Sequence, residues 1–398
     1  ASILSDMDAE QTDRFLRDLG AAKEAIAAGV SVGRAKSAET VWEIWQSYCA
    51  ELGLDPFLEA VQDKIPILQV FAQRVRTGEL AAGGNPILAR SVEDYLRHVA
   101  QTFLSVGSDD PRKRDRQPEI DFRLTRLQAA WKKQDPPPHR VKPLPVQVIR
   151  RMATLAMHSR HERTKAVADM TVLAFFFLLR PGEYVDTNSE STPFKIEDVN
   201  FYIGDTWLHP LTSTAEQLQA ATRVTLTFTT QKNGVRGEII GLSRSGDAIV
   251  CPVRAAVRRL LYLRSHGAPV GTPLARVFSE DGKARAEKIQ PKHITAAIRD
   301  VVKLFGTDLG FLPSDVSARS LRAAGANALL LANVDTNVIR LIGRWKSDEM
   351  LRYLHVQAAP LMQDYARRMV AGGEYTLLPN AQLVPQTLLP LNEAVPMR

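Results

Sequence analysis

Three consecutive prolines, Pro136–Pro138, divide the 398-residue chain into two parts. Proline lacks a backbone N–H and fixes φ, so a run of three cannot lie inside a helix or a central strand. Such a run favours an extended, semi-rigid connector. The chain is long enough for two or three domains. We therefore expect separate domains on the two sides of this run.

Before the prolines, the sequence predicts helices. Apolar residues recur at helical spacing in Ala9–Ala28, Ala38–Leu52, Ile65–Val75 and Val92–Val106. No alternating strand pattern interrupts them. We expect residues 1–110 to form an all-helical domain of four or five helices.

After the prolines, the sequence predicts a mainly helical domain over residues 143–371 with one small antiparallel sheet. Thr222–Thr229 and Gly237–Leu242 have β-type composition, and Asn233-Gly234 between them is the strongest short hairpin signal. The predicted helices are Gln147–His158, Arg163–Leu179, Cys251–His266, Pro291–Phe305, Ser317–Ala332, Thr336–Ile342 and Ser347–Val356. Residues 372–398 form an apolar tail broken by four prolines, which cannot build a core of its own.

The chain is basic, and its excess charge is concentrated in one place. It has 51 Lys and Arg against 44 Asp and Glu, a net charge of +7. Residues 111–142 hold ten basic and four acidic residues, which gives this stretch a net charge of +6. We expect a basic, proline-rich linker with one helix over Ile120–Lys133. It would either contact a polyanion or simply be solvated.

Several classes of protein are disfavoured by the sequence. Two cysteines, Cys49 and Cys251, cannot build a disulfide scaffold or a cysteine zinc cluster, and they fit a reducing compartment. The most apolar run, Val172–Leu179, is far shorter than the roughly 20 residues that span a bilayer. We therefore expect no membrane partner, and the acidic N-terminus does not resemble an export signal. No Asp/Glu cluster has the spacing of metal ligands, so we expect no metal.

Two basic segments could carry chemistry. Arg180 directly follows the very apolar run, where it could bind a ligand or simply stabilise a helix C-terminus. Arg319 and Arg322 lie three apart at a predicted helix start, so both can point the same way. A helix N-terminus that presents arginines suits a phosphate, although an exposed basic turn would look the same.

Two further segments carry a lysine and a tyrosine. Lys232 lies in the predicted hairpin turn, either solvated or placed to donate a proton. Gly343-Arg344-Trp345 precedes a predicted helix that carries Tyr353. That tyrosine could serve as a reactive group or pack in the core.

The order of these four segments resembles the catalytic domain of tyrosine recombinases, the phage-integrase-like superfamily. The resemblance covers residues 143–371, and residues 8–110 are similar to the core-binding domain of these enzymes. The sequence motif from Gly343 to Tyr353 is similar to the corresponding motif of the crypton and DIRS-like recombinases of eukaryotic mobile elements. The resemblance implies a DNA recombinase or transposase that cuts and rejoins specific double-stranded sites without metal or ATP. It also implies a tetramer on two sites, in the nucleus for a eukaryotic element and otherwise in the cytoplasm or nucleoid.

The resemblance implies a role for each candidate residue. Tyr353 would be the nucleophile that forms a 3′-phosphotyrosine, Arg180 and Arg322 would clamp the phosphate, and Lys232 would protonate the leaving 5′-oxygen. Glu183 would orient Arg180, and Trp345 would bind or support the phosphate site, because an indole N–H can only donate.

One position departs from the family pattern. Arg319 occupies a place where the family commonly has histidine, and arginine is too basic to accept the tyrosine proton. Arg319 can therefore act only through its charge. His293 and His355 are possible substitutes for the missing base.

DNA contacts are expected from the basic stretch, which would cross the duplex between the two domains. The expected contact residues are Arg112, Lys113, Arg114, Arg116, Lys132, Lys133, Arg140 and Lys142, with Trp131 beside them. The helix Pro291–Phe305, with Lys292, is a candidate for reading bases in the major groove. The tail is expected either to pass to a neighbouring subunit or to hang loose.

Two alternative functions stay open. Arg319 in place of histidine would suit a DNA-binding protein derived from a mobile element, with weak or no catalysis. A type IB topoisomerase-like enzyme would use similar chemistry without pairing two sites.

Overall fold

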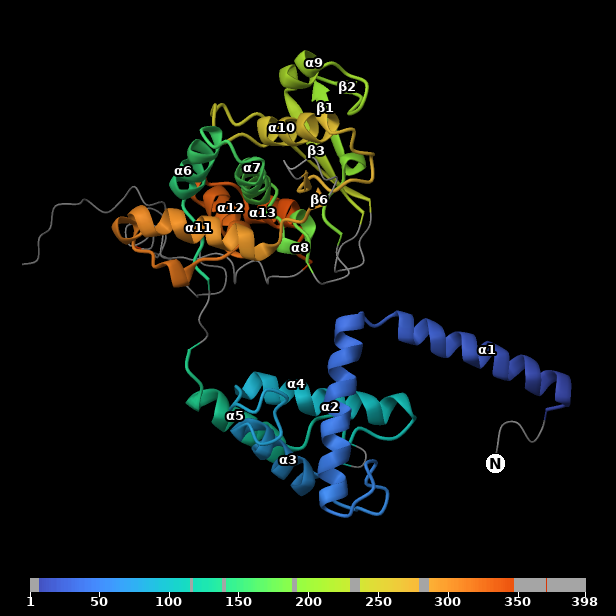
Figure 1. The fold of residues 1–398 in the computed structure, drawn as a ribbon. Coiled ribbons are helices and arrows are strands. Elements are labelled where there is room, and N and C mark those ends of the chain that lie inside the picture. The colour runs from blue at the N-terminus through green and yellow to red at the C-terminus, as the bar shows by residue number, and fades with distance from the viewer. Residues whose placement is uncertain are drawn as a thin grey trace, which may run out of the picture. The chain divides into compact units, whose positions relative to one another are not determined.

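The computed structural model describes residues 7–114, 117–137, 141–187, 192–229, 237–278, 286–346 and Val370. The chain forms two compact units that divide between residues 139 and 140 (Figure 1). Each unit has its own hydrophobic core. The predicted fold class, mainly helical with a small antiparallel sheet, is confirmed.

The first unit is all-helical over its described residues. Its helices are α1 (Ala9–Ala28), α2 (Val32–Glu51), α3 (Ile65–Thr77), α4 (Ala89–Ser105) and α5 (Phe122–Gln134). Aromatic side chains dominate the core, where the rings of Trp45, Tyr48 and Phe71 contact one another. The described residues of α1 include none that is buried.

The first unit extends beyond the expected boundary at residue 110, because α5 packs into its core. Leu124 and Trp131 of α5 are buried there. The Asp135 carboxylate, just after α5, accepts a hydrogen bond from the backbone N–H of Ala89 and pairs with Arg76. The expectation that Trp131 lies at a DNA contact is corrected by the structure, since the indole fills the core instead. Much of the expected linker is therefore part of a folded unit.

The second unit contains the predicted sheet and most of the helices. Its helices are α6 (Val146–Met157), α7 (Glu162–Phe176), α8 (Pro181–Tyr184), α9 (Ala215–Ala220), α10 (Pro252–Ser265), α11 (Pro291–Phe305), α12 (Ser320–Leu331) and α13 (Thr336–Gly343). Short 3-10 helices lie at η2 (Ile196–Asp198), η3 (Thr307–Leu309) and η4 (Pro313–Asp315). Its strands are β1 (Val199–Ile203), β2 (Thr206–Leu208), β3 (Arg223–Phe228), β4 (Glu238–Ser243), β5 (Val277–Phe278) and β6 (Ala286–Glu287).

The main sheet has the order β2-β1-β3-β4, with all neighbouring strands antiparallel. The two predicted strands are β3 and β4, which pair with Phe228 opposite Glu238. The predicted turn that carries Lys232 lies outside the described residues. The sequence analysis missed β1 and β2, which are short and add to the edge of the predicted pair.

Helix α7 is the centre of the second unit, and it packs against α6, α10 and α12 (Figure 1). Ten of its fifteen residues are buried, because its apolar side chains are not confined to one face. It ends at Phe176, before the predicted Leu179, since Leu178 has a left-handed backbone with φ of 50°. That reversal turns the chain toward Arg180.

Candidate active site

Arg180 is held by the carboxylate that follows it on the next short helix. The chain leaves α7 through Leu178, and Arg180 lies directly before α8. Glu183 Oε2 accepts a hydrogen bond of 2.7 Å from the Arg180 backbone N–H, and Oε1 accepts one of 3.0 Å from Arg180 Nη1. Glu183 is buried, while the Arg180 side chain keeps 31% of its surface exposed. The guanidinium is thus oriented by Glu183 and still accessible from solvent.

Arg322 is buried beneath the backbone that leads to Arg180. Its Nη1 donates to the Leu178 carbonyl oxygen at 2.6 Å, and its Nη2 donates to the Gly343 carbonyl oxygen. Its guanidinium carbon lies 4.2 Å from the centre of the Trp345 ring. Arg322 therefore touches both the segment before Arg180 and the segment after α13.

Gly325 allows the helix of Arg322 to approach α7 closely. A Cβ atom at this position would lie 2.1 Å from the carbonyl oxygen of Phe175, which is far inside van der Waals contact. Any larger residue would push α12 away from α7. The small residues after Arg322 thus set the spacing between the two arginine segments.

Arg319 lies in a different environment from Arg322. Helix α12 begins at Ser320, three residues later than predicted, so Arg319 stands at the N-cap position. Its side chain is exposed, whereas Arg322 is buried. The expectation that both arginines point the same way from one helix start does not fit this arrangement.

The turn after α13 explains the Gly-Arg-Trp motif. Arg344 adopts a left-handed backbone with φ of 57° and ψ of 43°, which folds Trp345 back over Gly343. A Cβ atom on Gly343 would lie 1.6 Å from the Trp345 ring, so only glycine fits. Trp345 is buried, and its ring contacts Arg322.

Arg344, to which the sequence analysis gave no role, contacts several parts of the site. Its Nη1 donates to the carbonyl oxygens of Phe177 and Ile342, and its Nη2 lies 2.9 Å from Glu183 Oε2. Its guanidinium also stacks 3.7 Å from the centre of the Phe228 ring. A sequence signal existed, because Arg344 lies inside the motif that resembles the recombinases.

The three arginines are linked through one carboxylate and one carbonyl oxygen. Arg180 and Arg344 both bind Glu183, and Arg344 and Arg322 both donate to the Leu178 carbonyl oxygen. Burial lowers the pKa of Arg344, but the Glu183 carboxylate beside it opposes that effect, and guanidinium stays charged in proteins. The four side chains together are therefore positive and can bind an anion.

Tyr184 and α11 fix the loop that leads to Arg322. The Tyr184 hydroxyl donates to the Ala318 carbonyl oxygen, and the Ala318 N–H donates to Thr295 Oγ1. Burial raises the pKa of Tyr184 well above its usual range, so the hydroxyl stays protonated. This buried tyrosine is a support and not a nucleophile.

A small, partly open pocket lies beside the cluster. It is lined by Glu183, Thr192, Phe194, Asp198, Phe228 and Thr229. Burial raises the pKa of Asp198, whose Oδ1 accepts a hydrogen bond from the Thr229 hydroxyl. Thr229 is the last described residue before the segment with Lys232.

The proposed nucleophile and general acid cannot be placed. Tyr353 and Lys232 both lie outside the described residues, and so does His355. His293 lies on α11, where its Nδ1 accepts from the Gln290 backbone N–H and its Nε2 is 2.8 Å from Arg163 Nη2. Burial, with Arg163 beside it, lowers the pKa of His293.

Most of the described DNA-contact candidates are already ion-paired within the chain. Arg112 pairs with Asp110, and Lys132 pairs with Glu93 at 2.8 Å. Lys142 pairs with Asp315 at 2.9 Å in the second unit. Lys113, Lys133 and Lys292 are exposed. Arg116 and Arg140 lie outside the described residues.

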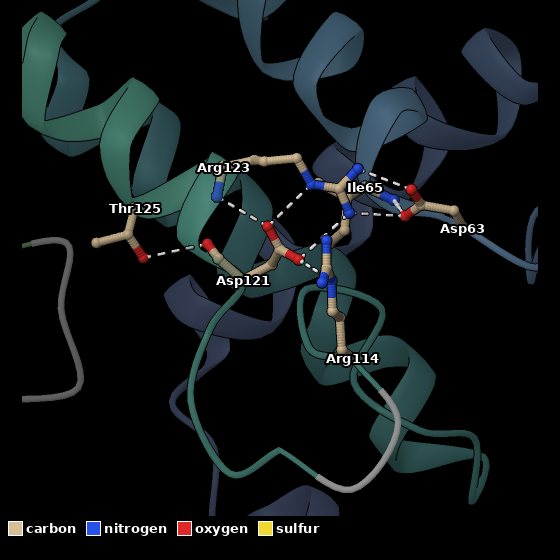
Figure 2. A network of polar contacts seen from close by, with 6 residues as sticks. All are labelled: Asp63, Ile65, Arg114, Asp121, Arg123 and Thr125. Atoms are coloured by element: carbon tan, nitrogen blue, oxygen red, sulfur yellow. Dashed lines mark hydrogen bonds and ion pairs between the residues drawn. The ribbon is translucent and has the colours of Figure 1, made fainter.

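Arg114 belongs to a larger network, which Figure 2 shows from close by. The buried Asp121 carboxylate accepts from the backbone N–H of Arg123 at the start of α5. It also pairs with the Arg114 and Arg123 side chains, and Arg123 reaches on to Asp63 before α3. The network ties the start of α5 to the start of α3.

The part of the chain that the structure describes contains neither a group of metal ligands nor a membrane-spanning helix. No group of three or more His, Cys, Asp or Glu side chains could hold a metal ion there. Among the same residues, no helix has the length and apolar character needed to cross a membrane.

Comparison with known proteins finds similar structures but no similar sequence. The sequence matches no protein-family model and no curated protein. The chain is similar to the Tn1549 transposon integrase in complex with circular intermediate DNA, at 12% identity and a TM-score of 0.45, covering 83% of this chain and 99% of that one. It is also similar to XerA recombinase, at 15% identity and a TM-score of 0.35, covering 83% and 98%.

A third similar structure is XerH recombinase bound to its difH substrate, at 12% identity and a TM-score of 0.43, covering 76% of this chain and 70% of that one. At these identities and TM-scores, a functional proposal depends on this chain's own residues.

Proposed function

We propose that this chain is a site-specific DNA recombinase that cuts and rejoins double-stranded DNA through a 3′-phosphotyrosine on Tyr353. The carrying observation is the cluster of Arg180, Arg322 and Arg344 around Glu183. Arg344 and Glu183 are 161 residues apart in the sequence, yet their side chains are in contact. Arg322 of the same cluster contacts Gly343 and Trp345, and Trp345 lies eight residues before Tyr353 in the sequence.

The chemistry requires positive charge at the phosphate. Tyr353 Oη loses its proton to a base or to water and attacks the phosphorus, the bond to the 5′-oxygen breaks, and Lys232 gives that oxygen a proton. The pentacoordinate transition state carries extra negative charge, which guanidinium groups stabilise. A partner 5′-hydroxyl then attacks the phosphotyrosine and restores both the phosphodiester and the tyrosine. The bond energy is conserved, so the cycle needs no ATP. We propose that it needs no metal either, because the guanidinium groups supply the positive charge at the phosphate.

The two clamp arginines enter this reaction differently. Arg180 is partly exposed and can meet a phosphate directly, while Arg322 is anchored on two backbone carbonyl oxygens. A guanidinium has five N–H donors, so backbone anchoring and phosphate binding are compatible in one side chain. Arg319, exposed at the α12 N-cap, adds charge and cannot take the tyrosine proton.

The resemblance also guides the finer parts of the proposal. The Gly343-Arg344-Trp345 motif supports the proposal that the protein comes from a crypton or DIRS-like mobile element. Such a protein would act in the nucleus. We propose a tetramer on two DNA sites, with residues 372–398 docking on a neighbouring subunit.

A second candidate function is sequence-specific DNA binding with weak or no cleavage. Arg319 favours it, because an arginine stands where the family commonly has a histidine and is too basic to take the tyrosine proton. A topoisomerase-like enzyme would instead relax plasmids that lack any specific site.

Covalent trapping on nicked suicide substrates tests the proposal. A nick releases the 5′-hydroxyl fragment, so religation fails and the protein–DNA adduct accumulates. We expect the wild type to form an SDS-resistant adduct on a subset of a site library, in the presence of EDTA. Tyr353→Phe should form none, and Tyr365→Phe is the matched control that should retain it. Binding without any adduct, even at raised pH, would overturn the cleavage claim in favour of the second candidate.

A further inference from the structure

Arg344 is a buried arginine at a turn, and its contacts reach three separate segments. It donates to the carbonyl oxygens at the end of α7, to its own turn through Ile342, and to the Glu183 carboxylate on α8. We propose that Arg344 is a positioning residue for DNA cleavage. It would hold Glu183, and through Glu183 the Arg180 guanidinium, in register with the segment that leads to Tyr353.

The first step of the argument is the double use of Glu183. One oxygen, Oε2, receives both the Arg344 side chain at 2.9 Å and the Arg180 backbone N–H at 2.7 Å. The other oxygen receives Arg180 Nη1 at 3.0 Å. Because Arg344 holds the Glu183 carboxylate from one side, the oxygen that binds the Arg180 side chain is fixed in position. Without Arg344, Glu183 would keep its hydrogen bonds from Arg180 but lose the cation that holds it from the other side.

The second step is the geometry of the turn. Gly343 and the left-handed backbone of Arg344 place the Trp345 ring against Arg322 while the Arg344 side chain points to Glu183. One turn therefore fixes both clamp arginines at once. In the sequence, Lys346 follows this turn and Tyr353 lies seven residues further on.

The third step is the choice of arginine. Arg344 donates to carbonyl oxygens from Nη1 and to a carboxylate from Nη2, while its flat face lies on the Phe228 ring. A planar guanidinium can make these contacts together, and a lysine ammonium cannot reproduce the fork. Lysine at this position should keep the charge and lose the alignment.

This inference rests on the proposed function and is tested in the same trapping assay with the full-length protein. Arg344→Met keeps the length of the side chain and removes the guanidinium. We expect DNA affinity to hold and cleavage to slow about 100-fold, the cost of a misplacement near 1 Å. Arg344→Lys should be intermediate. Arg340→Met, an exposed arginine on the same helix, is the matched control and should cleave at the wild-type rate.

Two readouts separate positioning from a general loss of structure. If Arg344 acts through Arg180, the double variant Arg180→Ala/Arg344→Met should be about as slow as Arg180→Ala alone. A methylphosphonate at the scissile position removes the negative charge that the clamp neutralises. On that substrate, the relative defects of Arg180→Ala and Arg344→Met should both shrink by about 10-fold or more.

The outcomes are distinct. No wild-type adduct on any site would overturn the proposed function, and this inference with it. Wild-type cleavage with a normal Arg344→Met rate, or with a defect that is additive and not relieved by methylphosphonate, would overturn the inference alone. If Arg344→Met does not fold, as judged by its thermal melt, Arg344→Lys decides by the same two readouts.

Discussion

The two units each contain a cluster of arginines and carboxylates, and the clusters differ in charge balance. In the first unit, Arg114 and Arg123 meet Asp63 and Asp121, two cations against two anions (Figure 2). In the second unit, Arg180 and Arg344 both pair with the Glu183 carboxylate, and Arg322 shares the Leu178 carbonyl oxygen with Arg344.

The difference indicates that the first cluster holds the fold together, and it fits the proposal that the second cluster binds an anion. In the first cluster every guanidinium has a carboxylate partner, and Asp121 also caps α5, so its charges are used to hold helices together. In the second cluster Arg180 and Arg344 share the Glu183 carboxylate and Arg322 donates to two backbone carbonyl oxygens, so these four side chains together carry net positive charge. A basic run in the sequence, such as the one that contains Arg114 and Arg123, can therefore serve to stabilise the fold. A largely buried set of arginines, such as Arg180, Arg322 and Arg344, can bind an anion.

The largest expected effect breaks the second cluster. Arg322→Ala should lower the cleavage rate by on the order of 10²–10³, because one donor to the transition-state charge is removed. Arg123→Ala in the first cluster is the control. Its cleavage rate per folded molecule should stay at the wild-type value. Single-turnover cleavage on a nicked substrate measures both, and equal losses in the two variants would erase the distinction between the clusters.

Breaking the first cluster should change stability. Asp121→Ala removes the N-cap of α5 and should cost about 1–2 kcal/mol of unfolding free energy in the first unit. Hydrogen exchange of α5 peptides in the full-length protein reports it. Asp109→Ala, an exposed neighbour, is the control. Unchanged α5 exchange in Asp121→Ala would show that the cluster is not a support.

The first cluster should also respond to acid. Hydrogen bonds from Arg123 lower the pKa of Asp121 in the folded protein. Because the folded pKa lies below the unfolded value of about 3.9, the stabilisation is present at neutral pH and is lost as the pH falls through the folded pKa. The difference in α5 protection between wild type and Asp121→Asn should be full at pH 6 and shrink below about pH 4. A difference that persists in acid would contradict the ion-pair account.

The smallest expected effect concerns DNA affinity. Lys113 and Lys133 are exposed, whereas Lys132 is paired with Glu93. Changing the two exposed lysines to Gln should flatten the salt dependence of binding by about 0.9 in slope for each phosphate that is no longer neutralised. Lys132→Gln should change it less. An equal change in both variants would mean that ion pairing within the chain does not decide which lysines meet DNA.

Periodicity predicted much of the fold. The predicted helices Ala9–Ala28 and Pro291–Phe305 have the bounds seen in the structure, because their apolar spacing is uninterrupted and prolines or a glycine mark their ends. The short strands β1 and β2 have too few residues for a clear alternation, and the pairing of β1 with β3 is a long-range interaction that no local pattern encodes.

The site was predicted in part. Motif order identified Arg180, Glu183, Arg322 and Trp345, which the structure brings together. Arg344 was missed because its partner Glu183 is distant in sequence. The basic stretch resembles a linker when its charges are counted without their partners, and those partners include acids from other segments, such as Asp63 and Glu93.

The most direct test of the central claim locates the covalent bond. After trapping on a nicked site and digestion with trypsin, Tyr353 and Tyr365 fall in one peptide, since cleavage follows Arg352 and Arg367. Fragmentation of that peptide by mass spectrometry assigns the nucleotide adduct to one tyrosine. We predict an adduct on Tyr353 in the wild type and none in Arg322→Ala at matched times. An adduct on Tyr365, or one that forms at the wild-type rate without Arg322, would contradict the account.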